Sequence, residues 1–454
     1  MATLPLSGPE RRRVAGMRSP YAPVRDGLIR DYYFWILLLL APIQSILLTP
    51  IQGTTPAFLL TLMAGGFLMG ADRRYVKVLL FYAGFWLVYA LYMAFSLSGY
   101  LIDQPDMSRL TVIRELYIYG YLKQTHVTQG LYLFTALLFT FVVYEYYQES
   151  FLKYAYFGIL ALCLYGFYEF IYFAMFADNG DFLSNRNFGD LDTAAAGAGE
   201  GDFATGSALQ LSNLFGPGFM RLKSLVGEPS MYALTVTPFT VYAFVRRWWL
   251  IFALLLLSLV LSTSSTAILG LGIGMGYAVI RQREEAILYI GTGLVVFVLL
   301  YVAVEPVHSA IDTLLFQKLD TTSGTERLTS FVEHASVISD GNIVRALFGL
   351  GFGTVRALDM MSNLLANVGV VGFLGYSALL LMPCFLLRRR ADTDAIVATL
   401  LSIYVMEMVT VSEYAYLPPW FMAALGYARV REQRRQARSL SPSAMNARAL
   451  QVLA

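Results

Sequence analysis

The chain has 454 residues, of which 57% are hydrophobic and 14% are charged. An average soluble domain carries roughly 25% charged residues, so this composition excludes an ordinary soluble protein and predicts a polytopic membrane protein. The formal net charge of +2 gives no reason to expect a nucleic-acid partner. Cys163 and Cys384 lie far apart in apolar runs, which indicates neither a disulfide framework nor a metal site.

Twelve apolar runs can be read as membrane spans, on the basis that a helix must cross roughly 30 Å of hydrocarbon. A few are short and need flanking interfacial residues. The predicted fold class is therefore an all-α polytopic membrane protein with about twelve transmembrane helices. The runs lie at about 32–49, 56–71, 75–99, 129–147, 151–177, 230–245, 248–262, 266–280, 286–306, 364–387, 394–410 and 417–429.

The distribution of lysine and arginine predicts the orientation, because cytoplasmic loops carry an excess of these residues. With the basic segment 1–31 in the cytoplasm, the cytoplasmic turns and the basic tail at 431–454 together hold 23 of the 33 Lys and Arg residues. Both termini are then cytoplasmic, and 32–430 forms a single transmembrane domain. Two long loops, at about 178–229 and 307–363, are external and are expected to contain short helices.

The first external segment, between the third and fourth spans, has apolar residues at Leu110, Ile113, Leu116 and Tyr117. This is a helical spacing. It predicts an amphipathic helix that lies along the membrane surface and covers the protein.

The loop at 178–229 begins with a stretch rich in glycine and alanine, which suggests a solvated lid. Within it, Asp190 and Asp192 resemble the metal-binding Asp-x-Asp of nucleotide-sugar transferases. The surrounding composition favours the lid, so we predict neither a metal nor another cofactor.

The same loop ends in "RLKSLVGEPS", which places Arg221, Lys223 and Glu228 directly before an apolar span. Pro229 suits the first turn of a helix, and a carboxylate beside it favours the helix N-terminus. One interpretation is a charged helix start, with both cations reaching to the interface. The other is functional, because charge beside a membrane span is costly and usually serves a purpose.

Two later external stretches also carry polar groups. Four hydroxyls, Ser262 to Ser265, follow the seventh span, where helix capping and packing explain them adequately. In the loop at 307–363, Arg327 and His334 are two helical turns apart and share a side of a predicted helix. The glycines that follow Arg345 lack a βαβ setting, so they predict a tight re-entrant turn rather than a dinucleotide site, although their amides could cradle phosphate.

These stretches resemble the bacterial polysaccharide polymerase and O-antigen ligase superfamily, of the Wzy and WaaL type. The likeness covers the topology but only three short stretches of sequence: "R-x-K-S-x-x-x-E-P-S", the Ser/Thr-rich turn, and a late loop with Arg327, "LFGLGFGT" and "SNLLANVGVVGFLGYSALLL". It implies a GT-C-like glycosyltransferase in the bacterial inner membrane, with its active site on the periplasmic side.

The sequence departs from the family pattern at two positions. Ligases of this family carry a catalytic His before an Asn at the start of the span that follows the late loop, where this chain has Ser362-Asn363. Many members also have an Arg after the serine of the Ser-rich turn, where this chain has Thr266. The missing His favours a polymerase, and the "GEPS" form also looks like polymerases of exopolysaccharide and capsule systems.

The resemblance implies transfer of a growing glycan from undecaprenyl diphosphate to the sugar of another undecaprenyl-diphosphate-linked repeat unit, without a metal. The same lipid-linked oligosaccharide is then donor and acceptor, in contact with membrane lipid, and a chain-length regulator and a flippase are the expected partners. Glu228 is the candidate base, with His334 and Glu333 as alternatives. The other expected contacts are to the diphosphate, by Arg221, Lys223, Arg327 and Arg345, and to the remaining substrate, by Ser230, Tyr232, Ser264 and Asn363.

Two other functions remain open from the sequence. An O-antigen ligase would move the polymer onto lipid A–core. A lipid-linked oligosaccharide flippase or other transporter would share the twelve spans, but such proteins usually show internal repeats and ionisable groups in the membrane. No clear repeat is visible, and the main carboxylates within or near spans are Glu145, Glu169 and Glu407.

Overall fold

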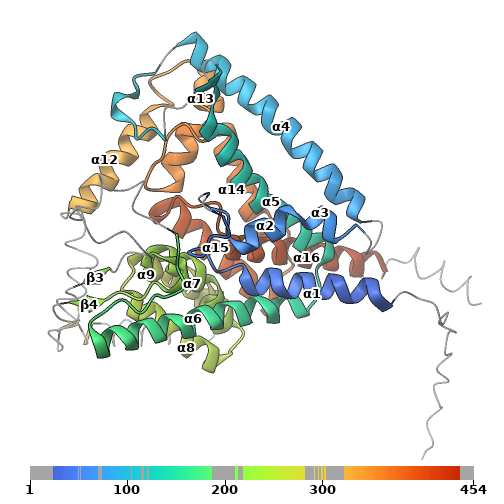
Figure 1. The fold of residues 1–454 in the computed structure, drawn as a ribbon, viewed down its shortest axis with the longest axis vertical. Coiled ribbons are helices and arrows are strands. Elements are labelled where there is room, and N and C mark those ends of the chain that lie inside the picture. Colours follow the sequence, from blue (N-terminus) through green and yellow to red (C-terminus); the bar gives the residue numbers. More distant parts are fainter. Residues whose placement is uncertain are drawn as a thin grey trace, which may run out of the picture.

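The fold was analysed in a computed structural model, which describes residues 24–49, 51, 53–69, 74–103, 105–113, 117–119, 122–186, 210–212, 218–281 and 322–439, with a few single residues between 291 and 302. Helices dominate the described chain (Figure 1). The helices are α1 (Val24–Leu40), α2 (Pro56–Leu62), α3 (Ala64–Phe67), α4 (Tyr75–Ile102), α5 (Gln124–Tyr146), α6 (Ser150–Phe176), α7 (Pro229–Val245), α8 (Trp249–Ser262), α9 (Ser265–Arg281), α12 (Thr322–Ser336), α13 (Ile343–Phe348), α14 (Met360–Leu386), α15 (Ala391–Thr410) and α16 (Leu417–Ser439). Strands β1 (Tyr117–Tyr119) and β2 (Leu122–Lys123) form one small antiparallel pair, and β3 (Leu211–Ser212) and β4 (Phe219–Met220) form another.

Five of these helices, namely α4, α5, α6, α14 and α15, are long and apolar enough to cross a membrane. On α4, large apolar side chains such as Leu80, Leu87 and Val88 are about two-thirds exposed. Helices satisfy their own backbone hydrogen bonds, so such a surface is stable in lipid but not in water. The chain is therefore an all-α membrane protein, as the composition predicted.

Most predicted spans coincide with a helix in the described residues. The predicted run 32–49 is helical only as far as Leu40, where α1 ends. The predicted run 56–71 is divided into α2 and α3, of seven and four residues, each too short to cross a bilayer by itself. Thr55 caps α2 by accepting from the Phe58 amide, and the helix ends where Met63 precedes the Gly65-Gly66 pair. The predicted run 286–306 lies almost wholly outside the described residues.

The most deeply buried helix is α7, which packs against α8, α9 and α15. Two glycines of α9 let the helices approach closely. A Cβ on Gly270 would fall 2.3 Å from the Met406 sulfur, and one on Gly274 would fall 2.7 Å from Val241. Ser402 also donates to the Gly270 carbonyl at 2.7 Å. Small residues and hydroxyls at helix contacts are typical of membrane bundles.

Charged residues from several helices meet at the end of the molecule where α1 begins and α16 ends (Figure 1). Glu145 lies 2.5 Å from Lys77 and 3.4 Å from Arg431, and Arg429 pairs with Glu149 at 2.6 Å. All five residues fall on the side that the sequence predicts as cytoplasmic. These contacts place Glu145 at the helix ends rather than in the middle of the bundle.

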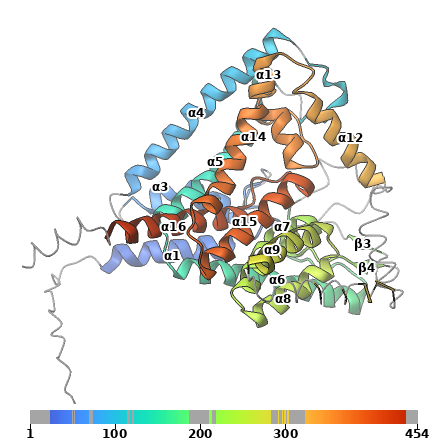
Figure 2. The ribbon, with the colours of Figure 1, turned by 180° about the vertical axis from the view of Figure 1, so that it is seen from behind.

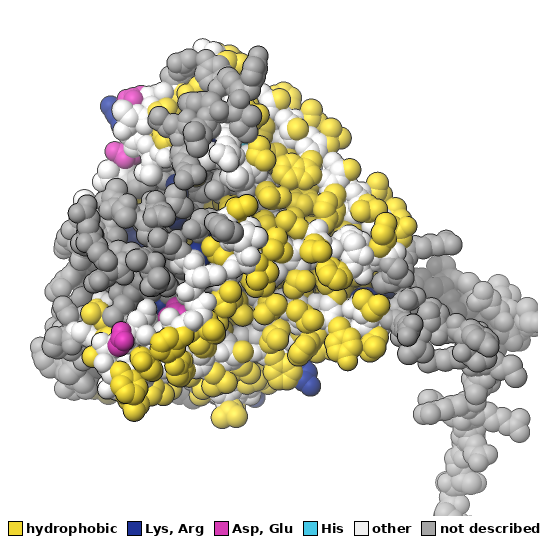
Figure 3. Space-filling model, in the orientation of Figure 1, with side chains coloured by type: hydrophobic (Ala, Val, Ile, Leu, Met, Phe, Trp, Pro, Cys, Tyr) yellow, Lys and Arg dark blue, Asp and Glu magenta, His cyan; other side chains and the backbone are white. Residues whose placement is uncertain are grey.

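The opposite end carries β3, β4 and the turns that the sequence predicts as external (Figures 1 and 2). Figure 3 shows the molecule in the orientation of Figure 1. Hydrophobic side chains cover the centre and right of the face toward the viewer, while most visible charged side chains lie toward its left. An apolar surface beside a more polar end is the distribution expected of a protein that sits in a bilayer.

The predicted amphipathic helix after α4 is absent from the described part of this segment. Val112 instead forms an antiparallel bridge with Val355, the Ile113 amide donates to the Thr354 carbonyl at 3.1 Å, and the Arg356 amide donates to Thr111 at 2.8 Å. Thr111, Val112 and Ile113 are β-branched and favour extended backbone. Pairing with 354–356 outweighs the helical spacing.

The glycine-rich stretch before α14 forms the predicted tight turn. Gly349, Gly351 and Gly353 all have positive φ, at 71°, 104° and 88°. Asn367 of α14 holds the turn closed, because its Oδ1 accepts from the amides of Thr354 and Val355 at 2.9 and 3.0 Å. These amides are thus occupied by the protein's own side chain.

Candidate functional site

The segment that begins with Arg221 crosses the ends of α8 and α9. The Leu222 amide donates to Leu261 at 3.1 Å, and the Arg221 guanidinium donates to the Thr263 hydroxyl at 3.0 Å and to Gln210 Oε1 at 3.3 Å. Burial lowers the pKa of Arg221, and the negative charge of Glu228 opposes that shift. Arg221 therefore lies within electrostatic range of Glu228, at the Ser/Thr-rich turn that the sequence singled out.

Glu228 immediately precedes α7, and Pro229 occupies the first turn, as expected. The Glu228 carboxylate does not cap the helix amides; it accepts a short hydrogen bond from the Ser230 hydroxyl. Both side chains are partly exposed. Part of the helix-start interpretation is thus correct, but the carboxylate is left available beside Arg221.

Lys223 is buried in the protein, unlike Arg221 and Glu228, which are partly exposed. Its side chain is fully buried and pairs with the equally buried Asp181 at 3.1 Å, with Glu169 of α6 within electrostatic range. Neither an interfacial position nor a diphosphate contact is compatible with this burial, so both expectations for Lys223 are corrected. The ion pair between Lys223 and Asp181, with Glu169 nearby, holds the loop on α6. Removing one charge of such a buried pair would leave the other uncompensated.

The turn between α15 and α16, residues 411–416, contributes a second carboxylate. Glu413 is partly exposed, and its Oε1 accepts from the Ala415 amide at 2.9 Å. Ser412 donates to the Ala357 carbonyl at 2.6 Å, which ties the turn to the segment that carries Arg356. The turn is therefore fixed against the loop that precedes α14.

Glu413 is the centre of a charged cluster that we call the arginine–carboxylate site. Burial raises the pKa of Glu413; the hydrogen bond from the Ala415 amide and the nearby charges of Arg186 and Arg356 lower it, and Glu228 raises it. Arg186, Arg356 and Glu228, from three other segments, thus lie within electrostatic range of Glu413, and Arg221 lies within range of Glu228. Among these described residues, three are cations and two are carboxylates.

The two additional arginines are held by their backbones. The amides of Asn185 and Arg186 both donate to Ser45, at 3.1 and 3.0 Å, and the Arg186 guanidinium donates to the Gln44 carbonyl at 3.3 Å. Arg356 is fixed by its amide on Thr111. Both side chains are partly exposed, which is suitable for binding an anion.

Tyrosines line the same region. Tyr416 is buried, and the charges that act on its hydroxyl come from Arg186, Arg356, Glu413 and Glu228. Burial is the main reason that the pKa of Tyr416 is raised, so the phenol remains a neutral hydrogen-bond donor. Tyr132 of α5 lies within range of Arg186 and Glu413. The Tyr132 side chain is partly exposed, whereas Tyr416 is buried and packs behind the site.

Arg327 of α12 approaches the same turn from another side, where its guanidinium donates to the Thr410 carbonyl at 2.8 Å. Thr410 is the last residue of α15, and the negative end of the helix dipole attracts a cation there. Arg327 is therefore at the edge of the site, bound to Thr410, which precedes Glu413 by three residues.

Arg345 does not belong to the site. It lies on α13, which Figures 1 and 2 place at the far corner from α7, and it is 2% exposed. Its guanidinium pairs with Asp103 at 3.2 Å and donates to the Asp340 carbonyl at 2.7 Å. The predicted diphosphate contact is replaced by a structural one, because the loop returns to the end of α4.

His334 and Glu333, the alternative bases, lie near the end of α12. The His334 ring is 1% exposed, with Nδ1 2.7 Å from the Ser330 carbonyl, and Nε2 has no hydrogen-bond partner among the described residues. Glu333 is partly exposed. A buried imidazole cannot receive a proton from a substrate hydroxyl in this conformation, so the His334 assignment is corrected.

The predicted substrate contacts divide into two groups. Ser230 is partly exposed beside Glu228, whereas Tyr232 is fully buried beside Cys163 and Ser258. Asn363 is also buried, and its Oδ1 accepts from Asn367 at 2.9 Å. The structure therefore places Tyr232 and Asn363 in packing roles.

Ser264 is 4% exposed at the turn before α9, next to the Thr263 that binds Arg221. No described group of three or more His, Cys, Asp or Glu side chains is arranged to hold a metal ion. Asp190 and Asp192 lie outside the described residues.

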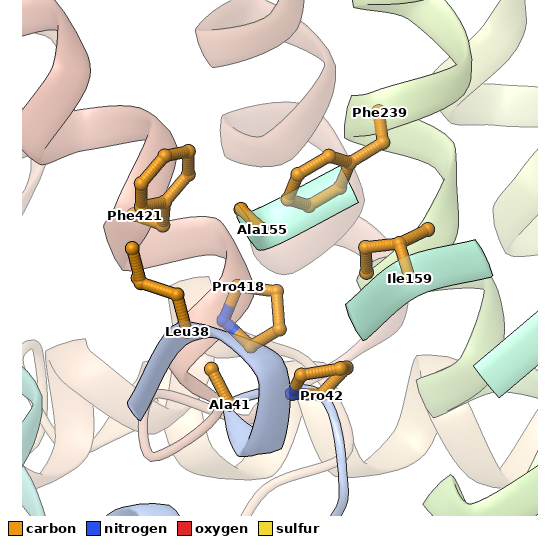
Figure 4. A pocket seen from close by; sticks show the side chains of 8 residues that line it. All are labelled: Leu38, Ala41, Pro42, Ala155, Ile159, Phe239, Pro418 and Phe421. Atoms are coloured by element: carbon orange, nitrogen blue, oxygen red, sulfur yellow. The ribbon is translucent and has the colours of Figure 1, made fainter. Parts of the chain in front are cut away.

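A small apolar cavity lies inside the bundle, between α1, α6, α7 and α16 (Figure 4). Phe239, Phe421 and Pro418 are among its lining residues, and no charged side chain lines it. It lacks the polar groups that a substrate site requires, so the arginine–carboxylate site remains the candidate.

The sequence did not indicate three residues of the site, namely Glu413, Arg186 and Arg356. Arg186 and Arg356 lie in the two predicted external loops, but nothing in the spacing joins them to Arg221. The available signal for Glu413 was an ionisable residue in a very short external turn between two apolar spans.

Comparisons of the sequence with protein-family models and with curated proteins found no match.

Proposed function

We propose that this chain is a polysaccharide polymerase of the bacterial inner membrane. It transfers a growing glycan from undecaprenyl diphosphate to the sugar of another lipid-linked repeat unit on the periplasmic side. The observation that supports this most is the arginine–carboxylate site, which joins Arg221 and Glu228 of the family-like stretch to Arg186, Arg356 and Glu413. The GT-C-like arrangement and the topology with both termini inside belong to the same proposal.

The cations fit the leaving group. A diphosphate diester carries two negative charges and gains a third as the bond to the anomeric carbon breaks. Guanidinium groups stay charged and donate paired hydrogen bonds to phosphate oxygens. Donors placed in advance where charge develops are usually the largest contribution to such catalysis. The three arginines, with Arg327 at the edge, supply this charge without a divalent ion.

The carboxylates fit the acceptor. The sugar hydroxyl must lose its proton as it attacks, and a positioned carboxylate can accept it. Glu228 and Glu413 are both partly exposed, so a hydroxyl can reach them. His334 and Lys223 have no part in this mechanism, because both are buried.

The test uses purified protein and the lipid-linked repeat unit extracted from cells that lack it. A ladder of lipid-linked chains on a gel supports a polymerase. A single transfer to added lipid A–core, without a ladder, would identify a ligase instead. Movement of the lipid-linked unit across a vesicle membrane without any new glycosidic bond would identify a flippase, and either result would overturn the proposal.

A further inference from the structure

The arginine–carboxylate site contains two carboxylates from different parts of the chain. Glu228 precedes α7, and Glu413 lies in the turn before α16. Where two acids share one site, the environment commonly gives them different tasks. The sequence favoured Glu228 as the base, because the conventional His is missing at Ser362.

The contacts of the two side chains differ. Glu228 accepts from Ser230 and lies beside Arg221, whose guanidinium is anchored on Thr263. Glu413 uses Oε1 for the Ala415 amide, and its Oε2 accepts no hydrogen bond from the described residues. Arg186 and Arg356 act on Glu413 through their charge.

The turn that carries Glu413 is rigid. Ser412 is bonded to Ala357, Tyr414 donates to Gln129 of α5, and Trp420 donates to the Tyr414 carbonyl at 2.7 Å. Three elements thus fix a partly exposed carboxylate, one oxygen of which accepts no hydrogen bond within the described part of the chain. A rigid support of this kind is what a base needs to meet its substrate in a defined geometry.

We infer that Glu413, rather than Glu228, is the catalytic base that takes the proton from the acceptor hydroxyl. This inference rests on the proposed function. The acceptor oxygen forms a bond to the anomeric carbon of the donor while its proton moves to Glu413 Oε2. The bond from that carbon to the diphosphate oxygen breaks, and the electron pair leaves on the diphosphate, which the arginines bind. Glu413 then releases the proton to water, and Glu228 positions the acceptor.

The environment of Glu413 supports this role. Burial raises its pKa and so increases its affinity for a proton, while nearby cations keep the ionised form accessible. The charged and titratable groups within electrostatic range of it are Arg186, Arg356, Glu228, Glu407, Tyr132, Tyr376, Tyr414 and Tyr416, and Arg327 of α12 binds the nearby end of α15. Because a base acts when ionised, activity must fall as pH drops through this pKa.

The test compares Glu413→Gln, Glu413→Asp and Glu228→Gln in the full-length purified protein. Asp340→Asn, an exposed change in the predicted loop at 307–363, is the matched control. Transfer is measured with the extracted repeat unit, and binding is measured separately with undecaprenyl diphosphate. We expect Glu413→Gln to lose at least about 100-fold in turnover while binding undecaprenyl diphosphate within a few-fold of wild type. Glu413→Asp should retain some activity, and the acidic limb of its profile of turnover against pH should shift.

Three results separate the possibilities. If the wild type makes no ladder, the proposed function fails and the inference fails with it. If the wild type makes a ladder and Glu413→Gln keeps turnover within tenfold, the function stands and the inference is wrong. Should Glu413→Gln not fold, Glu413→Asp decides: an acidic limb of its pH–rate profile that stays where it is in the wild type would also refute the inference. Loss of the acidic limb in Glu228→Gln alone would assign the base to Glu228.

Discussion

Lys223 and Asp181 form an ion pair at 3.1 Å with both side chains fully buried. The pair joins the segment before α7 to the loop after α6, and Ser224 strengthens the same junction by donating to the Leu162 carbonyl at 2.6 Å. One residue of "RLKSLVGEPS" thus anchors the stretch, while Arg221 and Glu228 on either side face the site. The anchoring sets where those two side chains lie.

Lys223→Ala is expected to destabilise the protein by about 3–5 kcal/mol, because it leaves a buried carboxylate uncompensated. Thermal unfolding in detergent measures this. The double variant Lys223→Met with Asp181→Leu should recover much of the loss, since removing both charges removes the desolvation cost. A Lys223→Ala protein of normal stability that no longer binds undecaprenyl diphosphate would instead restore the diphosphate role.

Arg221→Ala should abolish polymer while the protein still inserts normally. Removing one preorganised donor to a developing anion typically costs about 100- to 1,000-fold in rate. Arg221→Lys keeps the charge but loses the paired donors, so it should recover only part of the activity. Arg109→Ala is the control, because Arg109 is exposed and makes only a long contact, 3.9 Å, with the exposed Asp106 among the described residues. Near wild-type chain length in Arg221→Ala would eliminate its diphosphate role.

The sequence was sufficient for the class of fold and for most helices, because span length and apolar composition depend on local residues. It was insufficient for the site. Glu413 is adjacent to Arg356 only because Ser412 bonds to Ala357, a contact between residues 55 positions apart. The helical spacing at Leu110 failed for the same reason, since a bridge to Val355 cannot be read from nearby residues.

Arg356→Ala should shift the pH dependence of transfer. Arg356 lowers the pKa of Glu413, so its removal raises that pKa, and the acidic limb of the rate profile moves to higher pH. Arg186→Ala should act in the same direction. The measurement is kcat/KM against pH, with Arg109→Ala as reference. A limb that stays in place in both variants would show that Glu413 does not control the profile.

Arg345→Ala should reduce stability without a specific loss of diphosphate binding. Its guanidinium is buried and satisfies two backbone carbonyls as well as Asp103, so truncation should cost about 1–3 kcal/mol. Gly341→Ala offers an independent approach, because a Cβ there would fall 1.8 Å from Arg345 Nε and displace the side chain. Both variants should bind undecaprenyl diphosphate normally once folded.

Asn367→Leu tests how the site depends on the turn before α14. Asn367 accepts from Thr354 and Val355 and donates to the Val355 carbonyl at 2.8 Å, directly before Arg356. Leucine has a similar volume but no polar atoms, so these buried backbone groups lose their partners and the turn loosens.

The expected result for Asn367→Leu is faster hydrogen exchange over 350–357, together with weaker undecaprenyl diphosphate binding, because Arg356 is no longer held in place. Thr140→Val is the matched control: Thr140 is a buried hydroxyl of α5 that bonds to Ala136 of its own helix. Faster exchange with unchanged binding and turnover would mean that Arg356 does not contribute to the site. In that case Arg186 and Arg221 alone would hold the diphosphate.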